Sequence, residues 1–293
     1  MNGQLGHELN NRLNECGDVI ALDRASADLS KWDKVKLALD KYQPDIVFNA
    51  AAYTAVDEAE EEQGLAYLVN AETPGKIAEY CKKESKLLIH YSTDYVFSGE
   101  ENAPHDEESQ TDPLNVYGAS KALGEKLIIE SGCGYFILRT SWVYALRGHN
   151  FIKTMQGLAE QRASLKVIGD QFSSPTSAEC LADLSVALLK KAIVKKEETQ
   201  QWPKGLYHAC SSDHTSWHGL ACAALSLLRP KFGQSWALKS ETDIESIPSE
   251  GFPLPAKRPL DSRMSPSLLE KDWGLKMPSW ESQLALCFKP WLD

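Results

Sequence analysis

The chain has 293 residues, of which 43% are hydrophobic, and a formal net charge of -10, so it can form one large α/β domain or two smaller ones. The acidic balance argues against a nucleic-acid backbone as partner, because phosphate binding needs a basic face. No apolar run approaches the roughly 18 residues of a membrane span, and no signal peptide is recognisable. The seven cysteines are scattered without a CxxC pair, which is typical of reduced thiols in a cytoplasmic protein.

The first residues indicate a phosphate-binding loop that leads into a helix. Gly3-Gln4-Leu5-Gly6 reads as the second half of a glycine-rich loop, and Leu9 and Leu13 continue from Leu5 at helical spacing. In a dinucleotide-binding unit, a buried strand precedes such a loop and supplies its first glycine. We therefore expect an N-terminally truncated unit that lacks this strand and this glycine.

Short apolar runs then alternate with amphipathic stretches of helical period. The expected strands are 18–22, 45–50, 86–92 and 135–141, and helices are expected at 31–42, 72–84 and 115–126. Continuous apolar runs suit strands that are buried on both faces of a parallel sheet. The alternation of strand and helix predicts an α/β fold with a doubly wound, Rossmann-like parallel sheet.

Beyond residue 150 this alternation loosens. Helices are expected at 150–162, 181–191, 215–229, 267–271 and 279–288, a surface loop at 195–205, a further strand at 205–210 and irregular structure at 241–267, which contains five prolines. We therefore predict an NAD(P)-binding domain over residues 1–150 and a smaller, mainly substrate-binding domain over residues 151–293.

Polar side chains gather where the expected strands end. These ends read Asp23-Arg24, "NAAAYT" (49–54), "STDYVF" (92–97) and "RTSWVY" (139–144). Because ligands bind at the carboxyl ends of the strands in open α/β sheets, these segments are candidates for the site.

Tyr117 and Lys121 lie four residues apart on an expected helix, which places them on one face about one turn apart. A lysine ammonium near a phenol favours the phenolate and lowers a tyrosine pKa that starts near 10. A tyrosine with such a pKa can exchange a proton with a carbonyl oxygen at neutral pH. The spacing alone is a weak signal, but the strand-end Ser-Thr that precedes it strengthens the interpretation.

Several longer motifs follow one another in the order of a known family. "NAAAYTAVDEAE", "HYSTDYVFSG", "PLNVYGASKALGEK", "RTSWVYA", "DQFSSPT" and "PAKRPLDSRM" together resemble the dTDP-4-dehydrorhamnose reductase branch of the extended short-chain dehydrogenase/reductase family, over nearly the whole chain. The resemblance implies NAD(P)H-dependent reduction of the C4 keto group of dTDP-4-dehydro-L-rhamnose to dTDP-L-rhamnose.

The resemblance also implies a role for each matched residue. Tyr117 is expected to donate the proton, Lys121 to hold the nicotinamide ribose, and Thr93 to hydrogen-bond the sugar carbonyl. Asp94 and Trp142 are expected to contact the hexose. The remaining cofactor contacts implied by the resemblance are Gly3, Gln4, Leu5, Asp23, Asp28, Leu29, Ala51, Ala52, Tyr53 and Asn70.

Two metal sites have weak support. Some bacterial members of the branch bind Mg2+ through glutamates at a dimer contact, and Glu8 and Glu179 match two such positions. The third position falls near Pro290, which cannot be a ligand, so Mg2+ is doubtful here. His214 and His218 lie four apart on an expected helix but lack a third ligand nearby, and we expect packing or surface roles for them.

Two other function classes stay open. A non-catalytic subunit on the same fold, like the regulatory subunit of methionine adenosyltransferase, would tolerate the incomplete phosphate loop. A sugar-nucleotide dehydratase is disfavoured, because Tyr95 stands where dehydratases of the superfamily place an acid. Asp23 suits NADH and Arg24 could pair with the 2'-phosphate of NADPH, so either cofactor is possible. A homodimer is also possible.

Overall fold

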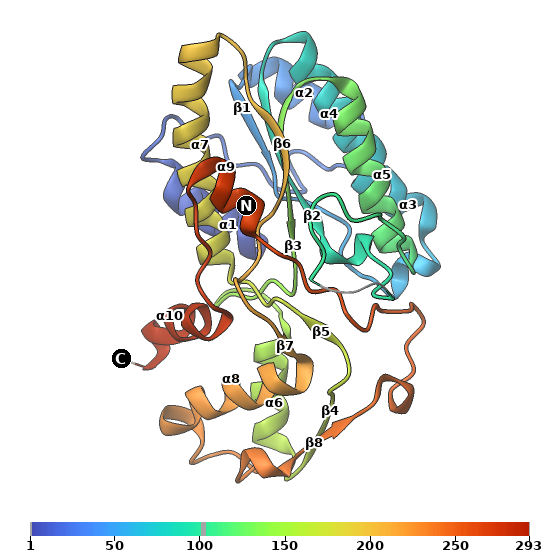
Figure 1. The fold of residues 1–293 in the computed structure, drawn as a ribbon, viewed down its shortest axis with the longest axis vertical. Coiled ribbons are helices and arrows are strands. Elements are labelled where there is room, and N and C mark those ends of the chain that lie inside the picture. The colour runs from blue at the N-terminus through green and yellow to red at the C-terminus, as the bar shows by residue number, and fades with distance from the viewer. Residues whose placement is uncertain (1, 101–103, 293) are drawn as a thin grey trace.

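The computed structural model describes residues 2–100 and 104–292 (Figure 1). Its α-helices are α1 (Gln4–Leu13), α2 (Trp32–Tyr42), α3 (Gln63–Tyr67), α4 (Thr73–Lys83), α5 (Val116–Ser131), α6 (Phe151–Gln161), α7 (Ala178–Thr199), α8 (Trp217–Phe232), α9 (Ser267–Trp273) and α10 (Trp280–Leu292). Its strands are β1 (Ile46–Asn49), β2 (Leu87–Thr93), β3 (Gly134–Thr140), β4 (Leu165–Ile168), β5 (Phe172–Ser173), β6 (Lys204–His208), β7 (Thr215–Ser216) and β8 (Ile244–Ile247).

The main sheet is entirely parallel. Within the described residues it has four strands in the order β1-β2-β3-β6. All residues of β2 are buried, as expected for a strand that is covered on both faces. Because the strands are parallel, their carboxyl ends meet at one edge, where Asn49 pairs with His90 and Thr93 pairs with Thr140.

Helices cover both faces of this sheet (Figure 1). Leu87 and Ile89 of β2 share a core cluster with Leu9 of α1 and Leu181 of α7. Leu88, between them on the opposite face, belongs instead to the cluster formed with α2 and α4. This period-2 alternation splits the apolar side chains of one strand between two helical layers. The structure therefore confirms the expected doubly wound, Rossmann-like fold.

A second group of elements lies at the carboxyl edge of the sheet, around α6, α8 and the parallel pair of β4 and β8 (Figure 1). It has a core cluster of its own, which includes Ile152, Leu225 and Trp236. Helix α7 and strand β6 follow residue 150 in the chain, yet they pack with the main sheet. The division at residue 150 stays a prediction.

Several expectations about local structure were wrong. Residues 18–22 form no strand. A strand needs hydrogen bonds to a neighbouring strand, and in the described part of the chain β1 is the edge strand of the main sheet, with no strand paired beyond it. Helix α7 continues to Thr199, into the first part of the expected loop at 195–205, and strand β6 begins at Lys204, before that loop would end. The proline-rich segment 241–267 contains strand β8. His214 precedes helix α8, so it does not share a helix with His218.

Among residues 2–100 and 104–292, no helix combines the length and apolarity that a bilayer crossing requires.

Candidate active site

Helix α5 carries Tyr117 and Lys121 close against the carboxyl ends of the strands. A Cβ atom on Gly124 would lie 2.2 Å from the carbonyl oxygen of Asn70, and one on Gly118 would lie 2.1 Å from that of Tyr95. Only glycine permits so close an approach. The helix begins where the Asn115 side chain accepts a hydrogen bond from the Gly118 amide. The glycines of this motif therefore set the depth at which the candidate catalytic residues lie.

Tyr117 and Thr93 come together at the end of β2. A hydrogen bond with Thr93 lowers the pKa of Tyr117, but burial outweighs it and raises that pKa to about 12. The Nζ atom of Lys121 lies 2.5 Å from the carbonyl oxygen of Tyr91 and 3.1 Å from Nε2 of His90. The expected depression of the Tyr117 pKa by Lys121 is therefore not found in this structure, because the amine bonds to other groups.

Asp94 accepts hydrogen bonds from segments that lie far apart in the sequence. Its side chain is buried, and Oδ2 accepts hydrogen bonds from Ser173 Oγ (2.9 Å) and Ser262 Oγ (2.6 Å). Oδ1 accepts a third bond from Thr93 Oγ1 at 3.1 Å. Burial raises the pKa of Asp94 to about 6, although the hydroxyl donors oppose this shift. The carboxylate thus ties the candidate catalytic threonine to two segments of the second group of elements.

Trp142 lies in a strained loop after β3. Its φ angle is +44°, which is uncommon for a bulky residue. The ring stacks on Trp217 with centroids 3.5 Å apart and an interplanar angle of 10°. Trp217 also donates from Nε1 to Gln171 Oε1 at 3.2 Å. The pair forms an aromatic wall that joins the end of β3 to the start of α8.

The expected phosphate-binding residues lie at the start of α1. Gly3 is the N-cap, and a Cβ atom on it would have no described atom within 4 Å apart from those of Gly3 and its chain neighbours. Gln4 donates from Nε2 to the Val143 carbonyl at 3.3 Å and accepts from Asn150 Nδ2 at 2.8 Å, so it ties α1 to the segment after β3. Leu5 packs against the core beneath the helix.

The expected adenosine contacts lie in the loop before α2. The Asp23 carboxylate accepts hydrogen bonds from Ser26, which lower its pKa. Asn2 donates to Asp23 at 3.5 Å and so links this loop to the start of α1. Asp28 accepts from the amide and hydroxyl of Ser30, and these bonds lower its pKa. The carbonyl of Leu29 accepts from Thr73 of α4 at 2.7 Å.

Asn70 clamps the loop that follows β1. It lies in a π-helical turn (Leu68–Glu72), a feature that is frequent at functional sites. Its Oδ1 accepts from the Tyr53 amide at 2.8 Å, while Nδ2 donates to the Tyr53 carbonyl and to Ser120 Oγ, both at 3.0 Å. Both amide protons are thereby used in fixing the loop to α5. Ala51 and Ala52, just before Tyr53, are exposed.

These residues fit a nicotinamide dinucleotide. The two exposed alanines offer a surface of small side chains at the end of β1. The start of α1, where no described side chain caps the helix, presents backbone amides next to an open glycine, which is a favourable place for a pyrophosphate.

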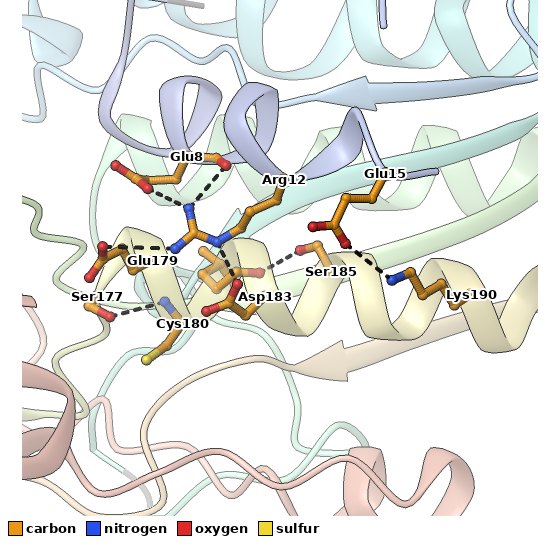
Figure 2. Close-up of polar contacts among 10 residues, drawn as sticks. Glu8, Arg12, Glu15, Ser177, Glu179, Cys180, Asp183, Ser185 and Lys190 are labelled. Atoms are coloured by element: carbon orange, nitrogen blue, oxygen red, sulfur yellow. Dashed lines mark hydrogen bonds and ion pairs between the residues drawn. The ribbon is translucent and has the colours of Figure 1, made fainter. Parts of the chain in front are cut away.

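The residues at the expected Mg2+ position do not fit a metal ion. Figure 2 shows the guanidinium of Arg12 among the carboxylates of α1 and α7, 2.5 Å from Glu8 Oε2, 3.8 Å from Glu179 Oε1 and in contact with Asp183. A cation of the chain itself thus lies between the two glutamates. Among the described residues, no group of three or more His, Cys, Asp or Glu side chains could hold a metal ion.

Comparison with known proteins places this chain in a family. The RmlD substrate binding domain family matches residues 1–292. A dTDP-4-dehydrorhamnose reductase of Burkholderia thailandensis is 40% identical over 100% of this chain and 97% of its own length. The enzyme of that name from Salmonella typhimurium is 41% identical over 95% of this chain and 92% of its own length.

The chain belongs to the RmlD substrate binding domain family.

Solved structures agree with this membership. The dTDP-4-dehydrorhamnose reductase of Bacillus anthracis in complex with NADP is similar with a TM-score of 0.86, at 34% identity over 99% of this chain and 96% of its own. The corresponding protein of Clostridium acetobutylicum has a TM-score of 0.87, at 32% identity over 100% of this chain and 97% of its own. The resemblance drawn from the sequence motifs is therefore confirmed.

Sequence reasoning missed several residues of the site. Ser173 and Ser262 lie inside the motifs "DQFSSPT" and "PAKRPLDSRM", but nothing in the motifs shows that both point at Asp94. His90 lies in an apolar strand, where it reads as a core residue. Trp217 is one aromatic residue of an expected helix. Only the fold brings these side chains to the site.

Proposed function

We propose that this chain catalyses the NADPH- or NADH-dependent reduction of the C4 keto group of dTDP-4-dehydro-L-rhamnose to give dTDP-L-rhamnose. The observation that carries the proposal is the meeting of Thr93, Tyr117 and Lys121 at the carboxyl ends of the strands. The relatives with the matching name, at about 40% identity over nearly the whole chain, support the same substrate. A non-catalytic regulatory subunit would tolerate the incomplete phosphate loop, but it gives no role to the meeting of Thr93, Tyr117 and Lys121, so we favour the reductase.

The bound nicotinamide would supply the hydride. Tyr117 would donate the proton from its hydroxyl to the sugar oxygen as that oxygen gains negative charge. The Thr93 hydroxyl, whose one proton is donated to Asp94 in this structure, would turn to donate to the same oxygen and stabilise its charge. The proton lost by Tyr117 must be replaced before the next turnover.

The cofactor would lie along residues of the first 150 positions. Gly3, Gln4 and Leu5 would face the pyrophosphate, and Lys121 would hold the nicotinamide ribose. The other proposed contacts are Asp23, Asp28, Leu29, Ala51, Ala52, Tyr53, Asn70 and Tyr117. Asn70 would act through the loop it clamps, since both of its amide protons are used.

The sugar would be bound between Thr93, Asp94 and the Trp142 wall. Asp94 would act mainly by holding the end of β2 against the segments of Ser173 and Ser262, because its carboxylate is buried and already accepts hydrogen bonds from three hydroxyl groups. On this view residues 1–150 mainly bind the cofactor and residues 151–293 mainly bind the substrate.

We also propose a cytoplasmic setting, which the seven free cysteines support. A homodimer stays a prediction, and sedimentation equilibrium of the purified chain would check it.

The test is direct. Purified chain, mixed with dTDP-4-dehydro-L-rhamnose and either NADPH or NADH, should consume reduced nicotinamide, as measured by its absorbance. The rates with the two cofactors measure the cofactor preference. A folded chain that consumes neither cofactor in the presence of this sugar would contradict the proposal.

A further inference from the structure

Lys121 is a buried lysine, and no carboxylate of the described residues is bonded to it. Its side chain is 1% exposed, and its two hydrogen-bond partners, the Tyr91 carbonyl and the His90 ring, are both neutral groups. Glu125, one turn further along α5, raises the pKa of Lys121, but its carboxylate is bonded to Arg139 through both oxygens, at 2.9 and 2.7 Å. Burial is the larger influence and lowers the pKa of Lys121 to about 8.

The other titratable groups of this region have partners of their own. Asp94, after β2, accepts hydrogen bonds from three hydroxyl groups, and Tyr117 is hydrogen-bonded with Thr93. The ring of His90 is fully buried, and this burial is the main cause that lowers its pKa well below the usual value. His90 is therefore neutral and carries a proton on only one ring nitrogen.

Asn49 determines which nitrogen carries that proton. Its Oδ1 accepts from the Ala51 amide at 3.4 Å, which orients its Nδ2 toward Nδ1 of His90 at 3.1 Å. An amide NH2 group can only donate, so Nδ1 must be the acceptor and the proton must lie on Nε2. This tautomer is assigned from the hydrogen-bond network. The N–H of His90 therefore points at Nζ of Lys121, 3.1 Å away.

Only one form of Lys121 completes this chain of donors and acceptors. A neutral amine accepts from His90 through its lone pair and donates one N–H to the Tyr91 carbonyl. An ammonium has no lone pair, so it would face the His90 N–H donor to donor. To charge Lys121, the imidazole must move its proton to Nδ1, and the Asn49 amide must turn away from its bond with Ala51.

We propose that His90, oriented by Asn49, is a positioning residue that stabilises the neutral amine of Lys121 relative to its ammonium form. Asn49, His90 and Lys121 thereby connect β1, β2 and α5 at the point where the candidate catalytic residues meet.

Its meaning for turnover rests on the proposed function. Tyr117 must regain a proton after each reduction, and Lys121 lies one helical turn away from it on α5. A lysine that titrates near neutral pH can take up and release protons under conditions where an ordinary lysine stays charged.

The test observes Lys121 itself, so its outcome is separable from that of the activity assay. Protein labelled with 13C and 15N on lysine is titrated by NMR, and the Lys121 signal is assigned by its loss in Lys121→Met. In the unaltered chain the signal should titrate near pH 8. In His90→Gln the amide oxygen can turn toward Nζ and accept from an ammonium, so the titration should move up by about one pH unit or more, a tenfold change in proton affinity.

His105→Gln is the matched control. His105 is also buried, but its ring stacks on Phe97, and among the described residues it is not hydrogen-bonded to Lys121, so the Lys121 titration should not move. If the proposed function holds, the basic limb of the turnover-against-pH profile should move in His90→Gln together with the NMR titration.

A second variant covers the case in which His90→Gln does not fold. Asn49→Asp places a carboxylate against Nδ1, which holds the proton there and turns the Nε2 lone pair toward Lys121, so the titration should again move up. An unchanged Lys121 titration in a folded His90→Gln or Asn49→Asp protein would overturn the proposal. So would an unaltered chain in which Lys121 stays protonated above about pH 10, as an ordinary lysine does.

Discussion

Arg12 and Lys121 are two cationic residues in opposite surroundings. Arg12 bonds carboxylates from both α1 and α7, and these bonds raise its pKa against the effect of burial (Figure 2). Lys121 is more deeply buried, yet it is bonded to a neutral ring and a backbone carbonyl. An arginine does not lose its proton in a protein, whereas the pKa of a buried lysine shifts readily.

The comparison distinguishes a charge that stabilises the fold from a charge that can change its protonation state. A cation that is matched by carboxylates keeps its charge and fastens two helices together. A cation that is surrounded by neutral groups has a protonation state that its neighbours can change. Arg139, which pairs with Glu125 behind Lys121, belongs to the first kind.

The largest effect is expected when a buried cation loses the carboxylate with which it is paired. Glu125→Ala leaves the Arg139 guanidinium buried without its partner; both side chains are 5% exposed. Arginine cannot become neutral by losing its proton, so the buried charge stays without a partner. The free energy of unfolding should therefore fall by about 3–5 kcal/mol in a denaturant titration.

Glu130→Ala is the control on the same helix, since its pair with Lys126 is exposed and should contribute less than about 1 kcal/mol. Equal losses in the two variants would mean that burial does not distinguish the two ion pairs.

The next largest effect is expected on turnover, at Tyr117 one helical turn from Lys121. Tyr117→Phe removes one hydroxyl and keeps the ring, so folding should be nearly unchanged. Turnover should fall by roughly two orders of magnitude or more, the scale of a positioned general acid. Steady-state kinetics measure this, with Tyr135→Phe at the opposite end of the sheet as the control. Near-normal turnover in Tyr117→Phe would show that this tyrosine is not the proton donor.

Asp94 extends the comparison to a buried anion among neutral groups. Its folded-state pKa of about 6 lies above the value of about 3.9 in an unfolded chain. A pKa raised by folding contributes stability below the unfolded value, and this stability is lost as the pH rises through the folded value. Relative to Asp94→Asn, the unaltered chain should therefore lose about 2–3 kcal/mol of unfolding free energy between about pH 4 and pH 6.

Denaturant titrations at several pH values measure this difference, and Asp33→Asn, on the exposed side of α2, controls for the general effect of losing a carboxylate. Parallel stability curves for the unaltered chain and Asp94→Asn would show that folding does not raise this pKa.

The smallest effect is expected at the matched cation on the surface. Arg12→Gln leaves Glu8 and Glu179 facing each other across α1 and α7, and should lower the unfolding free energy by about 1 kcal/mol at low salt. The loss should shrink as salt screens the repulsion. Lys190→Gln removes a more exposed pair, between α7 and Glu15 just after α1, and should matter less. An Arg12→Gln loss that does not depend on salt would indicate packing as its cause.

Much of the fold could be predicted from sequence because its signals are local. Continuous apolar runs marked β1, β2 and β3, and helical periodicity marked α1, α2, α4 and α5. Residues 18–22 misled because an apolar run becomes a strand only when a neighbour pairs with it. Strand β8 was missed because its partner β4 lies far away in the sequence, and the prolines around it suggested irregular structure.

The candidate site divides in the same way. Tyr117 and Lys121 were predicted to lie together because one helical turn joins them. The bonds of Asp94 were out of reach, because its partners lie 79 and 168 residues further along the chain. The pairing of His90 with Lys121 depends on how deeply α5 packs against β2, and no spacing in the sequence encodes that depth.

The reduction itself can be followed atom by atom. The chain is supplied with dTDP-4-dehydro-L-rhamnose and a reduced nicotinamide cofactor that carries deuterium at both hydrogen positions of C4, and the product is examined by NMR and mass spectrometry. We predict dTDP-L-rhamnose with one deuterium bound to C4 of the sugar. A folded chain that yields no reduced sugar, or a product without deuterium at that carbon, would contradict the proposed hydride transfer.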